Sequence, residues 1–239
     1  MNQTSNRSAA ILGILLALGL LGLGIAGYQA AISMKSLNRA VTVKGLSERE
    51  VPADLVIWPI QFQLAGNDLG ALAAETESVN EKIRSFLTSR NIKADEISIG
   101  MPTVTDLFAN NYGNTNDIRY RYTAKGALTV YSSNVDMVRN AMRESVELGK
   151  AGIAINNEQY GSQPQFLFTG LSELKPAMVE EATRNARAVA EKFAEDSGST
   201  LGKIKYARQG QFSIEDRDIN TPHIKKVRVV STLEYYLAD

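Results

Sequence analysis

An apolar run without a single charge spans residues 9–32 and is interrupted only near its end, by Tyr28 and Gln29. As an α-helix it would be about 36 Å long, enough to cross a hydrocarbon core of about 30 Å. The alternative is a cleavable signal peptide, whose apolar centre is normally about 7 to 15 residues long. Because this run is longer, we favour one N-terminal transmembrane helix, which is a retained anchor or an uncleaved signal. Its partner would be the lipid bilayer.

Charges beside the apolar run bear on its orientation. Lys35 and Arg39 follow the run, whereas only Arg7 precedes it. Taken alone, this bias slightly favours a C-terminal domain on the cytoplasmic side. The chain divides into a short N-terminal tail (residues 1–8), the anchor (9–32), a linker (33–38) and one large folded domain (39–239).

Small residues recur four positions apart inside the run. Gly13 with Ala17, and Gly22 with Ala26, would lie on one face of a helix and could allow another helix to approach closely. Small residues are also frequent in membrane spans that have no such partner. Both interpretations stay open.

Composition excludes several functions. The chain has 26 basic and 26 acidic residues, so its net charge gives no sign of nucleic-acid binding. It has no cysteine, which excludes disulfides and thiolate metal sites. The one histidine, His223, has no neighbours at ligand spacing. We therefore expect no metal and no cofactor.

Hydrophobic periodicity predicts the fold class. Helices separated by pairs of strands predict an α+β fold of antiparallel sheets with packed helices in two similar halves, preceded by the transmembrane helix. The expected strands cover residues 39–44, 55–64, 97–107, 118–131, 203–212 and 225–237, with short ones at 152–156 and 163–168; the expected helices cover 68–89, 134–149 and 172–198.

Asn67 and Asp68 are candidate N-caps of the helix at 68–89, and Asn134 is one for the helix at 134–149. Asp54 suits the role of a turn or cap acceptor. Period-two alternation places one set of residues of the strand 55–64 on a single face, namely Val56, Trp58, Ile60, Phe62 and Leu64, and the last strand alternates Val227, Val229, Ser231, Leu233 and Tyr235 in the same way. The polar stretch 45–54 reads as a turn, and Gly149 reads as a left-handed helix end. Pro59 suggests an edge strand or a bulge. The apolar stripe expected for the longest helix is Leu174, Met178, Ala182, Ala186, Val189 and Phe193. Alanines at 182, 186, 190 and 194 would let this helix pack close to a sheet or to a neighbouring subunit.

Two groups of motifs resemble the SIMPL domain family of exported bacterial proteins over about residues 40–237. The first is VTVKG at residues 41–45 followed by EREVPAD at 48–54. The second is an alanine-rich helix and the glycines that follow it: Glu181, Ala182, Ala186, Arg187, Ala190, Ala194, Gly198, Leu201, Gly202, Lys203 and Ile204.

This resemblance implies a periplasmic or cell-surface α+β domain, often of undetermined activity. Some family members assemble into ring-like or channel-like oligomers. The implication outweighs the weak charge bias on orientation and places the protein in the inner (cytoplasmic) membrane as a single-pass protein, with its C-terminal domain in the periplasm. The resemblance supplies no catalytic residues.

A ligand face is the one candidate binding site in the sequence. Arg119, Tyr120, Arg121 and Tyr122 alternate on a predicted strand, so the arginines would share one face and the tyrosines the other. Such residues could bind an anionic or carbohydrate ligand. The alternative is a packed tyrosine face and a solvated arginine face paired with acids.

Enzyme motifs are missing. No G-x-S-x-G nucleophile elbow occurs, and the glycines at 198 and 202 follow a helix, the reverse of a phosphate-binding loop. We therefore expect no enzymatic activity. The anchor, the alanine-lined helix, strand edges open to pairing and the resemblance to the SIMPL family favour a homo-oligomer with a role in envelope integrity or stress tolerance. The alternative is a periplasmic binding module whose small-molecule ligand is unknown.

Overall fold

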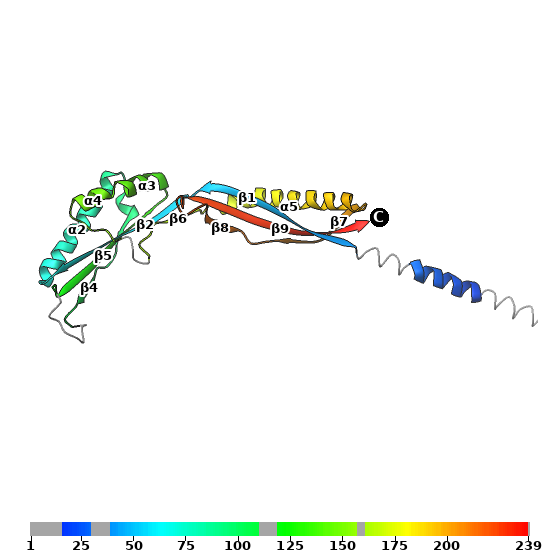
Figure 1. Cartoon of the computed structure of the whole chain (residues 1–239), viewed down its shortest axis with the longest axis horizontal. Helices are drawn as coiled ribbons and strands as arrows, with labels where there is room; N and C mark the ends of the chain where they lie inside the picture. The colour runs from blue at the N-terminus through cyan, green and yellow to red at the C-terminus, as the bar shows by residue number, and fades with distance from the viewer. Residues whose placement is uncertain (1–15, 30–38, 110–118, 157–160, 239) are drawn as a thin grey trace, which may run out of the picture. The chain divides into compact units, whose positions relative to one another are not determined.

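The protein is an α+β protein with antiparallel sheets (Figure 1). Its computed structural model describes residues 16–29, 39–109, 119–156 and 161–238. Residues 16–29 form a helix, and none of the helices in these four ranges is both long and apolar enough to cross a membrane. The rest of the predicted anchor, Gly13 included, and the predicted boundaries at residues 8, 32 and 38 lie outside the described residues. The likeness of two halves stays a prediction.

The folded chain divides into two compact units. The first unit comprises Met1–Glu48, Lys175–Phe212 and Arg228–Asp239, and the second comprises Arg49–Leu174 and Ser213–Val227. The chain passes from one unit to the other within three elements, which are β1 (Ala40–Pro52), α5 (Leu171–Asp196) and β9 (Ile224–Ala238).

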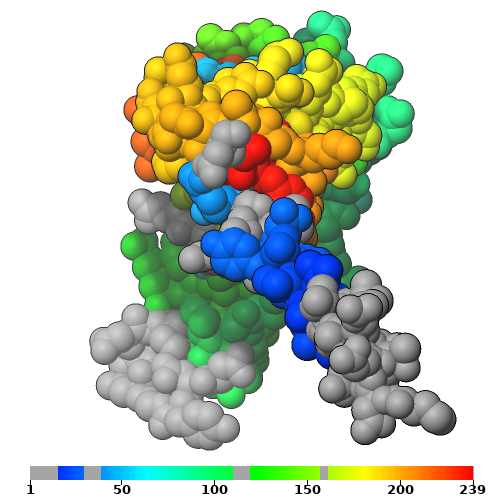
Figure 2. Space-filling view, turned by 90° about the vertical axis from the view of Figure 1, so that its right-hand side faces the viewer, coloured from blue at the N-terminus to red at the C-terminus, as the bar shows by residue number. Residues whose placement is uncertain are grey.

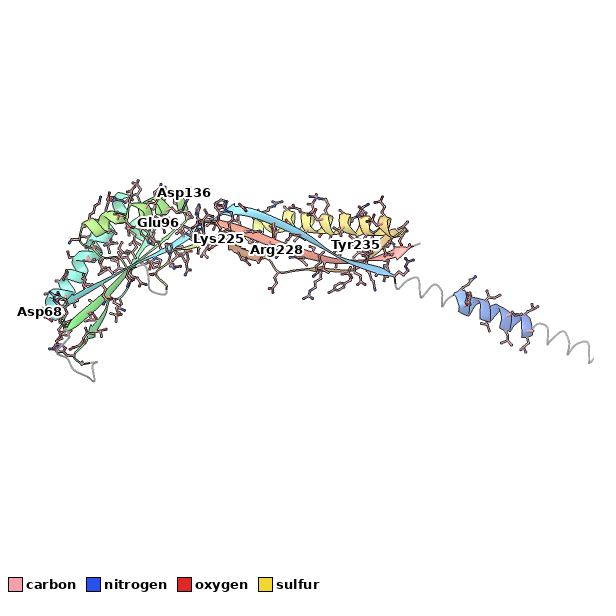
Figure 3. The ribbon with its side chains drawn as sticks, in the orientation of Figure 1. Asp68, Glu96, Asp136, Lys225, Arg228 and Tyr235 are labelled. Carbon is pink, nitrogen blue, oxygen red and sulfur yellow. The ribbon has the colours of Figure 1, made fainter. Side chains whose placement is uncertain are left out.

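A sheet with strand order β1-β9-β7 forms the first unit, where β7 is Thr200–Gln209. Strands β7 and β9 are antiparallel. Strands β1 and β9 are antiparallel too, because Leu237 N donates to Arg39 O at one end and His223 O accepts from Ala53 N at the other. The predicted alternation of β9 is confirmed: its buried residues include Val227, Val229, Ser231, Leu233 and Tyr235. Figure 3 labels Tyr235 and Arg228 on this strand.

Helix α5 packs on this sheet through a ridge of small side chains spaced four residues apart. Its buried residues are Met178, Ala182, Ala186, Ala190 and Ala194. The prediction that Val189 and Phe193 belong to the buried stripe is wrong, since they are 52% and 54% exposed. The alanine ridge faces the sheet, and these two larger side chains each precede a buried alanine by one position and therefore lie on the flank of the helix.

Strand β1 continues through the stretch predicted as a turn, so the turn prediction for residues 45–54 is wrong. Gly45 lies under α5, where an added Cβ would be 1.9 Å from Ala182 O and 2.8 Å from Ala186 Cβ. Glu48, on the other face, pairs with Arg228 across the sheet at 3.2 Å. The charged residue Glu48 therefore lies on the face of the strand that α5 does not cover, and the glycine allows close approach of the helix on the other face.

The second unit contains a five-stranded antiparallel sheet. Its order is β3-β5-β2-β6, with β4 also paired to β5. These strands are β2 (Leu55–Gly66), β3 (Ile97–Ile99), β4 (Thr103–Asp106), β5 (Tyr122–Ser132) and β6 (Gln165–Leu167), and β8 (Ser213–Asp216) pairs with β9. Pro59 lies opposite Thr129 of β5, just beyond the point where the ladder to β6 ends at Ile57. A proline tolerates this position because its missing N–H breaks no ladder bond.

Three helices accompany this sheet: α2 (Leu69–Ser89), α3 (Val135–Glu144) and α4 (Val146–Lys150); a short 3-10 helix covers Ala94–Glu96. The predicted N-caps are confirmed, since Asp68 accepts from Ala71 N at 2.7 Å and Asn134 accepts from Met137 N at 3.1 Å. Figure 3 shows Asp68 at the start of α2. The prediction for Gly149 is wrong: the positive φ, +83°, belongs to Gly152.

The core of the second unit confirms the predicted face of β2. Val56, Trp58, Ile60 and Phe62 are at most 4% exposed. They pack with buried residues of α2, β5 and neighbouring segments, among them Val79, Ile83, Phe86, Leu87, Leu128 and Val130. The short strand predicted at 152–156 is reduced to one bridge between Ile155 and Phe62.

Candidate functional site

The segment predicted to bind a ligand does not lie on one strand. Strand β5 begins only at Tyr122, so the predicted alternation of arginines and tyrosines over residues 119–122 is wrong. Local hydrogen bonds explain the difference: Arg121 N donates to Asn67 Oδ1 at 2.9 Å, and Arg121 O accepts from Leu107 N at 2.8 Å. The loop at 110–116 that would join this segment to β4 lies outside the described residues.

Arg121 is held by an acid and by aromatic rings. Its Nη2 lies 2.9 Å from Asp106 Oδ2, and its guanidinium carbon lies 5.0 Å from the Tyr122 ring centre. The hydrogen bond to Arg121 lowers the pKa of Asp106, and the same bond raises the pKa of Arg121. An anion would have to compete with Asp106. Arg119 lies over the ring of Tyr120 at 5.5 Å. A role of Arg119, Tyr120, Arg121 and Tyr122 as a ligand face stays a prediction.

A small hollow lies on the five-stranded sheet. Its volume is about 130 Å³, and its lining includes Gln61, Gln63, Thr103, Lys125 and Asn156. The register places Gln61 opposite Ala127 and Gln63 opposite Lys125, on the face opposite the buried Phe62. Amide and ammonium groups on this face could bind a small polar or anionic molecule. The sequence signal for this polar face is the alternation within β2, where glutamines alternate with core residues.

A broader groove lies between α2 and α4. Its volume is about 600 Å³, and Phe86, Arg90 and Leu148 contribute to its lining. The Arg90 guanidinium stacks on Phe86 at 3.9 Å and pairs with Glu144 at 3.0 Å and with Glu147. Because two carboxylates share this guanidinium, its charge is already balanced, and the arrangement fastens α4 to the end of α2.

Asp54, a motif residue, organises the approach to α5. Its carboxylate accepts from Thr169 N at 2.8 and 2.9 Å, from Thr169 Oγ1 at 3.0 Å and from Gly170 N at 3.0 Å. Helix α5 begins at the next residue, Leu171. The expected role of Asp54 as a turn or cap acceptor therefore agrees with its contacts, and the donors come from a segment more than a hundred residues away.

Replacing Asp54 by alanine is expected to lower the free energy of unfolding by about 2 kcal/mol, because charged hydrogen bonds are lost and two backbone donors lose their partner. Urea unfolding measures the effect. The Asp54→Asn variant keeps an acceptor oxygen and is expected to lose less. Equal losses in both variants would contradict the hydrogen-bond explanation.

His223 lies in a turn before β9 and is half-buried. Its ring meets the Phe166 ring edge-on, with the centroids 6.1 Å apart. Burial lowers the pKa of His223, and the charge of Arg139 lowers it further. Both effects favour the neutral form of the ring. No group of three or more metal-ligating side chains occurs in the part of the chain that the structure describes.

Asp218 shapes the turn that precedes His223. The hydrogen bond from Thr221 Oγ1, followed by that from Arg217, lowers the pKa of Asp218 to about 2 from an ordinary value of 3.8. A depressed folded-state pKa adds stability above the unfolded-state pKa, and this contribution disappears as pH falls through the folded-state value.

The pH dependence of unfolding tests this role. The stability advantage of the wild type over Asp218→Asn is expected to be full near pH 5 and to shrink as the pH falls toward about 2. Urea unfolding of both proteins at each pH measures it. An advantage that stays constant down to pH 2 would count against the assigned contacts.

The helix over residues 16–29 carries the described part of the predicted helix-packing motif. Ala17, Gly22 and Ala26 lie on it. A Cβ added to Gly22 would meet nothing within 4 Å. All three residues are exposed, and their use for helix packing stays a prediction.

The comparisons with known proteins decide the family. The model of the SIMPL family, a protein of unknown function (DUF541), matches residues 41–227. The chain belongs to the SIMPL family. No curated protein matches it significantly. In this SIMPL domain the motif residues Gly45, Asp54 and the alanines of α5 have structural contacts: they set the distance between helix and sheet and the start of the helix.

Proposed function

We propose that this SIMPL protein is a non-enzymatic, membrane-anchored protein of the periplasm that self-assembles. In this proposal residues 9–32 span the inner (cytoplasmic) membrane once, and the domain that follows forms a ring-like or channel-like homo-oligomer that supports envelope integrity or stress tolerance.

One observation carries the membrane part of the proposal. The helix over residues 16–29 exposes apolar side chains at 57% to 71%: Leu16, Leu18, Leu20, Leu21, Leu23 and Ile25. Transfer of a leucine side chain from water to an apolar medium is favourable by about 1.5 to 3 kcal/mol. A helix that is apolar on all sides belongs in lipid or in a protein core. The sequence continues this run at both ends.

Vesicle flotation tests the anchor. The full-length protein is expected to float with phosphatidylcholine–phosphatidylglycerol vesicles, and Leu20→Arg with Leu21→Arg is expected to abolish flotation. Val146→Arg is the matched control, because Val146 is similarly exposed, at 66%, but lies in α4. Equal flotation of all three proteins would overturn the anchor.

Periplasmic location has its own test. The chain has no cysteine, so Glu215→Cys introduces one thiol in β8. A membrane-impermeant maleimide is expected to label this thiol in cells whose outer membrane has been permeabilised. Labelling only after lysis of the inner membrane would reverse the proposed orientation.

Two features support self-assembly: membership of the family, and a strand edge in the first unit with no partner among the described residues. Light scattering coupled to size exclusion, on full-length protein in detergent, is expected to give one discrete multiple of the monomer mass. A monomer at every concentration would overturn self-assembly.

Ligand binding is the second candidate, and the hollow lined by Gln61, Gln63 and Lys125 favours it. Acetate, phosphate and simple sugars can be screened by thermal shift against the wild type and Lys125→Ala. A shift that disappears in the variant would support a binding module. No shift with any probe would remove this candidate.

A further inference from the structure

Strand β1 is an edge strand, and its backbone shows which residues face away from the sheet. Among the described residues β1 has one neighbour, β9. Arg39 O accepts from Leu237 N, so the odd-numbered residues of β1 bond to β9. In an antiparallel ladder the even-numbered residues then direct their N–H and C=O groups to the free edge. Their number includes Thr42, Lys44 and Leu46.

Part of this edge is already protected. The Asn185 side chain donates to Leu46 O at 2.9 Å, which occupies that carbonyl. Pro52 has no N–H to offer another strand. Thr42 and Lys44 lie between the start of β1 and Leu46, the residue that Asn185 contacts. The structure describes no partner strand beside them. The open part of the edge is therefore short and lies near Thr42.

Apolar side chains lie beside the open part. Val189 and Phe193 continue the flank of α5 that carries Asn185, at steps of four residues. Four helical residues advance about 6 Å, close to two strand residues. Since Gly45 lies against Ala182 and Ala186, this flank places Val189 and Phe193 on either side of Thr42.

The opposite edge of the sheet is less suited to pairing. Strand β7 has two register shifts against β9, between Leu201 and Ile204 and between Ile204 and Tyr206. Its exposed residues include Lys203, Lys205 and Arg208. Bulges and basic side chains are the usual protection of an edge strand against pairing. The comparison singles out β1.

We propose that two copies of the chain pair antiparallel through their β1 edges around a two-fold axis at Thr42. This contact rests on the proposed self-assembly and deepens it. Thr42 lies opposite its own copy, a favourable cross-strand pair, and Lys44 lies opposite Ala40, so no like charges face each other directly. Both α5 helices then lie on the same face of the joined sheet.

Helix spacing is compatible with this pairing. Strands lie about 4.8 Å apart, so two helices that are each centred between β1 and β9 of their own copy would be about 10 Å apart. Packed helices are separated by about 8 to 10 Å. Val189 and Phe193 of both copies fill the space between them. Figure 2 looks at one end of the first unit, where β9 (red) lies beside α5 (yellow to orange).

Cross-linking tests the register in the full-length protein in detergent. The chain has no cysteine, so the Thr42→Cys variant has one thiol in each copy. It is expected to form a disulfide-linked dimer on oxidation, because opposite strand residues have Cα atoms about 5.5 Å apart. The Lys44→Cys variant is the matched control and is expected to stay uncross-linked. Position 44 of one copy lies opposite position 40 of the other, so the two introduced thiols are four residues apart along the strand.

Charge substitution tests the helix flank. Val189→Glu with Phe193→Glu is expected to weaken self-association at least ten-fold in light scattering, with an unchanged circular dichroism spectrum. Ile204→Glu is the matched control on β7, where Ile204 is 50% exposed, and is expected to leave the oligomer intact.

The outcomes separate the contact from self-assembly itself. A wild-type oligomer without a Thr42→Cys cross-link, together with full association of the α5 double variant, would overturn the β1 contact and leave self-assembly standing. A monomeric wild type would overturn both. Cross-linking by Lys44→Cys as strong as by Thr42→Cys would overturn the proposed register.

Discussion

Replacing Gly45 by valine is expected to lower the free energy of unfolding of the first unit by about 3 kcal/mol or more, the upper part of the range for overpacking. Even one added carbon would lie 2.4 Å from Ala186 N, in addition to the contact with Ala182 O. The nearest atoms are backbone atoms of α5, so no rotamer change can relieve the clash. The helix must move away from the sheet and expose its alanine ridge.

Hydrogen exchange localises this effect. Faster exchange is expected for the amides of α5 and β1, whereas the single tryptophan, Trp58, reports on the second unit and is expected to keep its fluorescence spectrum. Gly149→Ala is the control, because an added Cβ there meets nothing within 4 Å. Wild-type exchange in α5 of the Gly45→Val variant would show that the helix does not depend on this close approach.

Phe62→Ala is expected to cost the second unit about 3 to 5 kcal/mol, the range for a buried phenylalanine. Phe62 is 2% exposed, and its ring covers Gly126, where an added Cβ would be 2.2 Å from the nearest ring atom. Urea unfolding followed by Trp58 fluorescence measures the loss. Gln63→Ala, next to it on the exposed face, is expected to change stability by less than about 0.5 kcal/mol.

A double-mutant cycle tests the fit between this ring and the glycine. Gly126→Ala alone is expected to be destabilising, because the new methyl group meets the Phe62 ring. In the Phe62→Ala background the same change is expected to be close to neutral or stabilising, because the space is empty. Additive losses would show that Phe62 and Gly126 do not pack as described.

Hydrophobic periodicity predicted the helices and strands that have one buried face. It missed the features that depend on contacts between residues distant in sequence. The alternation of β9 and the caps of α2 and α3 are local signals, and they hold. Strand β1 was shortened because Pro52 and the charged residues before it resemble a turn. The sequence does not reveal that Glu48 faces Arg228 across the sheet or that Gly45 lies beneath a helix.

Hydrophobicity also misled the assignment of the α5 stripe. Val189 and Phe193 are the larger apolar residues, yet alanines are buried in their place, because the distance between helix and sheet leaves no room for more. For the candidate ligand face, the residue types were right for an anion, but the pairing of Arg121 with Asp106 comes from another strand. Such pairings depend on register, which alternation alone does not determine.

The alanine ridge of α5 has a translational consequence. Alanine recurs every four residues, so a shift of the helix by about 6 Å along its axis, combined with a rotation of about 40°, would bring an identical side chain to each contact. The ridge therefore fixes the depth of the helix but not its axial position. That position depends on features that do not repeat, which are Met178 at one end, the bond from Ser47 Oγ to Glu181 and the bond from Asn185 to Leu46 O. A few polar contacts thus determine which of several equivalent positions the helix occupies.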